Sequence, residues 1–186
     1  MPGQKITDIR VTPIPVHYRK EVGKVAFADN IGSERTEWFV RARTDGGLEG
    51  YTIANRFMGR FAGFHSSEGT VRGLVALLRE VFLGSRVDDF LEVSEGRVTG
   101  VRDAYKQVFF SHGWMSILAY DLLGQDLGVS CTDLFGGRIK DWIPAYDTSL
   151  FYQDMSNPEK GAAQVAADAA DSRRDGYNAF KIKVGR

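Results

Sequence analysis

One short strand is predicted by the stretch Gly176-Tyr177-Asn178-Ala179-Phe180-Lys181-Ile182-Lys183-Val184-Gly185-Arg186. The strand covers Asn178 to Val184 and is bounded by glycines. Because strand side chains alternate between faces, Lys181 and Lys183 share one face. Two ammonium groups on one face repel each other, and burial of that face would add a desolvation cost; both effects lower a lysine pKa. A lysine of this kind can act as a base near neutral pH.

Alternating lysines have a second and more ordinary explanation. They are typical of a solvated sheet face or of a protected sheet edge. On these eleven residues alone the solvated face is favoured, so the choice depends on the sequence that precedes the strand.

Composition excludes several function classes. A hydrophobic content of 43% indicates a globular chain, and 24 basic residues balance 24 acidic ones. A net charge of zero provides no general attraction, so we expect neither nucleic acid nor a membrane as partner. No apolar run approaches the roughly 18–20 residues that span a bilayer, and no apolar segment follows the first five residues as in a signal peptide. A single cysteine, Cys131, allows no internal disulfide; we expect a buried structural thiol in a cytoplasmic protein.

The first part of the sequence predicts three antiparallel strands. They cover Lys5 to Val16, Thr36 to Thr44 and Leu48 to Ile53, and Asp45-Gly46 supplies a tight turn between the last two. The polar stretch from His17 to Arg35 predicts a loop of about 19 residues, either a lid or binding loop or a disordered insertion.

Helices are predicted next. Ser66 begins one that Gly84 closes, Asp88 or Asp89 caps a short one that runs to Glu95, and a long one covers Val101 to Leu123. The apolar stripe of the long helix comprises Tyr105, Val108, Met115, Leu118, Ala119 and Leu122. His112 lies within it and is interpreted as a packed or surface histidine, because no other ligand type stands at metal-binding spacing. Strands followed by helices indicate an α+β domain.

The pattern then changes to that of a parallel sheet. Ser130 and Asp133 cap a one-turn helix, and Trp142 to Leu150 predicts a strand. Asn157-Pro158 and the alanine-rich segment from Gly161 to Arg174 predict a helix, which the lysine strand follows. This is a β-α-β unit with parallel strands. Two parallel strands alone would leave open edges and a bare face, so we expect the chain to be the front part of a longer parallel α/β architecture.

Four segments together carry a family resemblance: Ala119–Gly128, Leu134–Gly137, Ile143–Tyr146 and Lys181–Gly185. In this order they resemble the enolase superfamily, in its mandelate racemase / muconate lactonizing enzyme branch. The resemblance implies an α+β capping domain at residues 1–125, a connector at 126–140, and the first β-α-β of a truncated (β/α)-barrel at 141–186.

The resemblance also implies roles for individual residues. Lys183 matches the base that removes the proton α to a carboxylate, and Lys181 matches the lysine that lowers its neighbour's pKa and contacts that carboxylate. The predicted loop and the stretch around Ile53 match the cap loops that select substrate. The substrate-loop candidates are His17, Asn30, Ile53, Asn55, Arg56 and Phe57.

The family binds Mg²⁺ through acids on the third, fourth and fifth barrel strands, which this sequence does not contain. We therefore expect Mg²⁺ in the complete family enzyme and none on this chain alone, for which no metal ligand is assigned. Without the metal, the enediolate formed by proton removal lacks its main stabilising charge, so the chain alone is expected to be inactive.

The resemblance therefore implies the amino-terminal part of a Mg²⁺-dependent lyase or isomerase. Such an enzyme dehydrates or racemises a small (hydroxy)carboxylate and is expected to be a homo-oligomer when complete. Two alternatives stay open. The chain is either a non-catalytic remnant that serves as a binding or oligomerisation module, or an unrelated α+β domain whose lysine strand is merely solvated.

Overall fold

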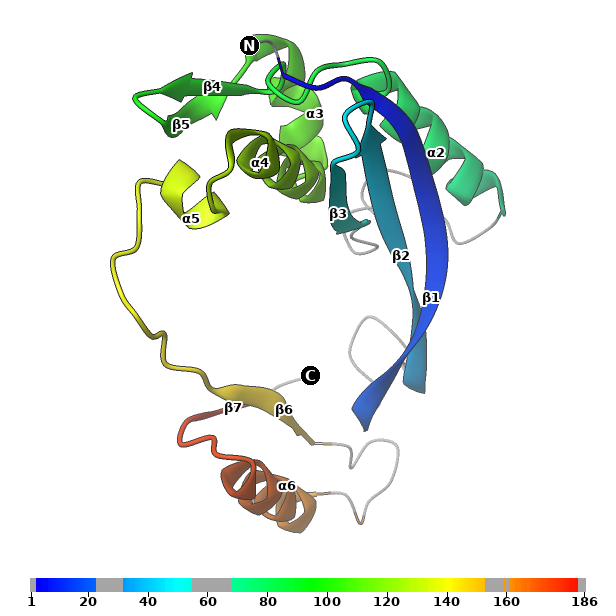
Figure 1. The fold of residues 1–186 in the computed structure, drawn as a ribbon. Coiled ribbons are helices and arrows are strands. Elements are labelled where there is room, and N and C mark those ends of the chain that lie inside the picture. Colours follow the sequence, from blue (N-terminus) through cyan, green and yellow to red (C-terminus); the bar gives the residue numbers. More distant parts are fainter. Residues whose placement is uncertain (1–2, 23–31, 55–67, 153–158, 160, 184–186) are drawn as a thin grey trace. The chain divides into compact units, whose positions relative to one another are not determined.

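The computed structural model describes residues 3–22, 32–54, 68–152, 159 and 161–183 (Figure 1). The chain divides into two compact units, the first made of Met1–Ile14 and Glu37–Ile139 and the second of Pro15–Thr36 and Lys140–Arg186. Among the described residues, no helix is long and apolar enough to cross a membrane.

A three-stranded sheet opens the fold, in the order β1-β2-β3. Its strands are β1 (Ile6–Val22), β2 (Gly32–Thr44) and β3 (Glu49–Ala54). Strands β2 and β3 pair antiparallel, from Trp38 opposite Ala54 to Arg43 opposite Glu49. The hydroxyl of Thr44 accepts the backbone N–H of Leu48 at 2.9 Å across the turn. The predicted hairpin is thereby confirmed.

The loop predicted from His17 to Arg35 is wrong at both ends, because β1 continues to Val22 and β2 begins at Gly32. Polar pairs join these strand extensions. His17 Nδ1 lies 3.2 Å from Glu34 Oε1, and Arg35 donates to the Tyr18 hydroxyl at 3.0 Å. Cross-strand pairs of this kind stabilise a ribbon without the apolar alternation that reveals a half-buried strand. Residues 23–31 lie outside the described residues.

The short helix predicted to end at Glu95 is also wrong. The structure has a hairpin there, in which β4 (Leu91–Ser94) pairs antiparallel with β5 (Arg97–Val101). Glu95 and Gly96 form its two-residue turn, with φ angles of 52° and 76°. Two consecutive positive φ angles match the turn type whose twist suits a hairpin. Turn geometry therefore overrides the capping potential of the preceding aspartates.

The helices of the first unit are α2 (Glu68–Phe82), α3 (Asp103–Ser111), α4 (Trp114–Leu127) and α5 (Cys131–Leu134). The single long helix predicted from Val101 to Leu123 is therefore two helices. The break falls at His112, whose φ of −133° and ψ of 63° are not helical, followed by Gly113. Glycine lowers helix propensity, and the break lets α3 and α4 run in different directions. Partial burial lowers the pKa of His112, which lies edge-on to Trp114.

Helix α5 begins with the predicted capping box, in which Ser130 and Asp133 exchange hydrogen bonds. Cys131 follows directly and is exposed. The expectation of a buried structural thiol is therefore wrong. Of this one-turn helix only Leu134 is buried, because a single turn presents one side chain to the core.

The core of the first unit lies between the sheet and the helices. Its largest fully buried side chains are Phe82, Phe90, Ile6, Leu78, Leu91, Met115, Leu118, Leu122, Leu123, Leu134 and Val40. Four residues of the predicted apolar stripe are fully buried, namely Met115, Leu118, Ala119 and Leu122. The other two, Tyr105 and Val108, pack against the core. Helix α4 lies against β3, where Thr52 Oγ1 donates to the Trp114 carbonyl at 2.9 Å.

The second unit contains the predicted β-α-β arrangement. Strand β6 (Asp147–Phe151), helix α6 (Ala162–Arg174) and strand β7 (Phe180–Lys183) follow in order, and β6 pairs parallel with β7. Strand β6 is shorter than predicted, because residues 142–146 are not in a strand and Pro144 has no N–H to donate. Trp142 and Ile143 are 72% and 84% exposed. The predicted Asn157-Pro158 helix start lies outside the described residues.

Gly50 supports a first prediction, because a Cβ there would lie 2.6 Å from Leu122 Cγ and 3.1 Å from Leu118 Cδ1. Gly50→Ala should lower the free energy of unfolding by about 1–3 kcal/mol, since α4 must shift to make room. Denaturant titration measures the change. Gly113→Ala is the matched control: its φ is −52° and its nearest contact would be 3.8 Å, so stability should hold or rise slightly. Equal effects of the two substitutions would contradict the close α4–β3 approach.

Candidate functional site

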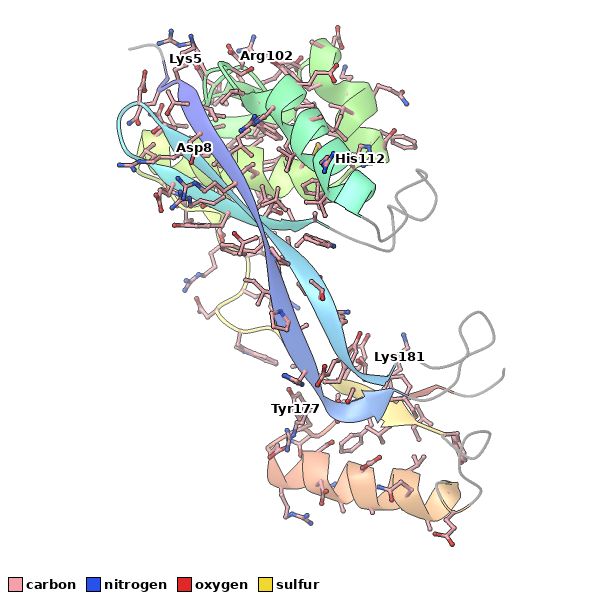
Figure 2. All side chains as sticks on the ribbon, turned by 90° about the vertical axis from the view of Figure 1, so that its right-hand side faces the viewer. Lys5, Asp8, Arg102, His112, Tyr177 and Lys181 are labelled. Atoms are coloured by element: carbon pink, nitrogen blue, oxygen red, sulfur yellow. The ribbon has the colours of Figure 1, made fainter. Side chains whose placement is uncertain are left out.

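The lysine strand is the candidate site, and its two faces differ. Ile182 of β7 stands opposite Leu150 of β6 in the parallel register. Leu150 is fully buried, and Val165 of α6 is only 5% exposed. This burial is expected where α6 covers one face of the sheet (Figure 1). Lys181 alternates with Ile182 and is exposed on the side of the sheet away from α6 (Figure 2).

Lys183 is the last residue of β7 and pairs with Phe151. The structure describes its backbone, and strand alternation predicts that it shares the face of Lys181. Among the described candidates, Lys181 and Lys183 lie two positions apart on one strand.

Two of the six substrate-loop candidates lie among the described residues, on different strands. His17 is exposed on β1 in the second unit, paired with Glu34, so it belongs to a strand and not to a loop. Ile53 belongs to β3 in the first unit and is 50% exposed. The remaining candidates, Asn30, Asn55, Arg56 and Phe57, lie outside the described residues.

Ile53 lies on a polar and aromatic face of the sheet. It stands opposite Phe39, whose ring stacks on Tyr51 at 5.4 Å between centroids. The Tyr51 hydroxyl donates to Glu49 at 2.6 Å, and Arg41 lies 3.4 Å from the same carboxylate. The hydrogen bond from Tyr51, aided by the charge of Arg41, lowers the pKa of Glu49, and the same bond raises the pKa of Tyr51.

Sequence reasoning missed a group of hydrogen bonds around one carboxylate, that of Asp147 at the start of β6. Asp147 Oδ1 accepts the Ser149 N–H at 2.8 Å, and Oδ2 accepts the Ser149 hydroxyl at 2.9 Å and the hydroxyl of Ser172 on α6. The Asp-x-Ser spacing is a local signal for the first two bonds. Ser172 lies 25 residues away, and no local pattern predicts that contact.

The described residues contain no group of three or more His, Cys, Asp or Glu side chains that could hold a metal ion. This part of the chain therefore does not fit a Mg²⁺ site, since the ion prefers several oxygen ligands in octahedral geometry.

Two curated relatives are similar to this chain in sequence. The chain is 30% identical over 147 residues to a probable glucarate dehydratase of Streptomyces coelicolor, an alignment of 72% of this chain and 33% of the relative. It is 34% identical over 71 residues to D-galactarolactone cycloisomerase of Agrobacterium fabrum, an alignment of 38% of this chain and 18% of the relative. The alignments therefore span a third or less of these relatives. No family model matches the sequence.

A solved structure shares the fold. All of this chain aligns with 43% of a mandelate racemase/muconate lactonizing protein of Geobacillus sp. Y412MC10, crystallised with magnesium and tartrate, at a TM-score of 0.65 and 23% identity. The relatives and this fold identify the class as the enolase superfamily. Within it, the chain belongs to the mandelate racemase / muconate lactonizing enzyme branch, as the four sequence segments predicted.

Tyr51→Phe tests the electrostatics around Ile53. Removal of the hydroxyl should raise the pKa of Glu49 toward its ordinary value, because the strongest interaction with its ionised form is lost. Carboxyl ¹³C titration by NMR measures the change. Asp133, whose pKa is lowered by Ser130 and not by Tyr51, serves as the internal control. An unchanged Glu49 titration would show that Arg41 dominates.

Proposed function

We propose that this chain contributes the lysine strand and capping sheet of an enzyme that removes the α-proton of a (hydroxy)carboxylate. One observation carries the proposal: β6 and β7 pair in parallel, α6 covers one face, and Lys181 lies on the other. In a (β/α)-barrel the helices lie on the outside and alternate strand side chains point to the inside. The catalytic residues are inward-pointing residues at the strand ends. The capping domain is assigned to residues 1–125, the connector to 126–140 and the barrel start to 141–186.

The two lysines have different roles in this proposal. The neutral amine of Lys183 takes the proton from the carbon next to the carboxylate. The ammonium of Lys181 contacts the carboxylate and, through its positive charge, keeps the proton off its neighbour. Lys181 is exposed among the described residues. Burial inside a complete barrel would strengthen the electrostatic effect of Lys181 on Lys183.

The substrate class follows from the curated relatives, a glucarate dehydratase and a galactarolactone cycloisomerase. Sugar acids and related (hydroxy)carboxylates are the proposed substrates, with dehydration or racemisation as the proposed outcome. His17, Asn30, Ile53, Asn55, Arg56 and Phe57 are the proposed substrate-selecting residues. We place the complete protein in the cytoplasm as a homo-oligomer.

Mg²⁺ is the proposed cofactor of the complete enzyme. The ion would supply positive charge to the enediolate. The described residues do not fit a Mg²⁺ site, so the proposal takes the ligands of the ion from other residues. The roles given above for the two lysines do not depend on the ion.

A second candidate function is a binding or oligomerisation module without catalysis. It is favoured by the core cluster of the first unit, whose buried members all lie between Ile6 and Leu134. A unit with its own core can persist without a catalytic barrel.

The 186-residue chain supplied with Mg²⁺ should not turn over glucarate, galactarate or mandelate, because it offers no fitting metal site among the described residues. Proton–deuterium exchange at the α-carbon, followed by ¹H NMR in D₂O, is the measurement. Exchange above the protein-free rate would contradict the predicted inactivity.

Lys183→Arg in the complete enzyme tests the base. Arginine keeps the positive charge but cannot deprotonate at neutral pH, so kcat should fall by about 10²–10⁴-fold. Lys140→Arg is the matched control at an exposed lysine outside the strand and should leave kcat unchanged. If both variants retain full activity, Lys183 is not the base.

A further inference from the structure

The β6–β7 ladder contains one extra residue on β6. Asp147 stands opposite Phe180, and the next regular pair is Leu150 opposite Ile182, so β6 advances three residues while β7 advances two. One additional residue on one strand is a β-bulge, a feature that re-aims the side chains beyond it.

The Asp147 side chain satisfies the backbone that the bulge takes out of the ladder. Its own N–H donates to the Ala179 carbonyl at 3.0 Å, which keeps Asp147 in the sheet. Its Oδ1 accepts the N–H of Ser149 at 2.8 Å, and its Oδ2 accepts the Ser149 hydroxyl at 2.9 Å. A half-buried N–H without a partner is costly, and this carboxylate supplies the partner for the Ser149 N–H.

The same carboxylate also joins the strand to the helix. Ser172 on α6 is 3% exposed, and its hydroxyl lies within hydrogen-bonding distance of both Asp147 and the Asp168 carbonyl, the latter at 2.9 Å. Asp147 therefore sits where β6, β7 and α6 meet.

A shift of register by one residue moves every side chain of a strand to the other face. With the bulge, the buried Leu150 stands opposite Ile182, which is 46% exposed, and Phe151 pairs with Lys183. Without it, Ser149 would stand opposite Ile182, and Leu150 would pair with Lys183 and leave the buried side. The bulge thus decides which β6 residue stands beside the second lysine.

We propose that Asp147 is a positioning residue: its carboxylate holds the bulge that sets the register of β6 against the lysine strand and so places Phe151 beside Lys183. Its relevance to catalysis rests on the proposed function of the two lysines.

NMR on the 186-residue chain tests the proposal through cross-strand nuclear Overhauser contacts and amide exchange. Asp147→Ala should abolish the Leu150–Ile182 pairing and speed exchange of the Ser149 amide by about tenfold, the loss expected for one hydrogen bond. Asp147→Asn keeps an oxygen that accepts the Ser149 N–H and should retain the register. Ser172→Ala removes the hydroxyl that lies near Asp147 and the Asp168 carbonyl but leaves both Ser149 contacts in place, so it should also retain the register.

Retention of the Leu150–Ile182 pairing in Asp147→Ala would overturn the proposal, as would an equal register change in Ser172→Ala. If Asp147→Ala does not fold, Asp147→Asn decides: a native register supports the proposal, and a shifted or absent one overturns it. These measurements need no substrate and no active lysine. An unaltered kcat in Lys183→Arg would therefore refute the proposed function and leave the register result intact.

Discussion

The alternation of strand side chains is the constraint on which both units depend, because a strand that buries one face under a helix turns the other face away from it. In the first unit, Val40 and Ala42 face the core, and Gly50 lets α4 approach β3 closely. The opposite face is then left to Tyr51 and Arg41, which form a polar and aromatic network. In the second unit the same rule puts Ile182, which stands opposite the buried Leu150, on a different face from Lys181, although Ile182 is itself 46% exposed.

Family membership and the lysine strand reinforce each other, yet they support different statements. Membership rests on similarity along much of the chain, together with the shared fold. The proposed catalytic role of the lysines rests on the face that strand alternation predicts for both and on the burial that a closed barrel would add. Lys181 itself is exposed here.

Local patterns predicted local structure well. The Asp45-Gly46 turn, the capping box of Ser130 with Asp133 and the apolar stripe of α4 each depend on residues a few positions apart. The break at His112, directly before Gly113, was within reach, since glycine marks a weak point in any helix. The hairpin at Glu95-Gly96 was missed because aspartates upstream resembled a helix cap.

The sequence by itself determined the β-α-β unit, which follows from periodicity, and the family, whose resemblance four short segments carry. The shared face of the two lysines stays a prediction from strand alternation. Only the tertiary structure decided that β1 and β2 extend past His17 and Glu34, and that Asp147 meets Ser172 from another element. The physical reason is the same in both cases. Polar partners distant in sequence stabilise each other only after the backbone has brought them together, so neither residue carries a sign of the pairing in its own neighbourhood.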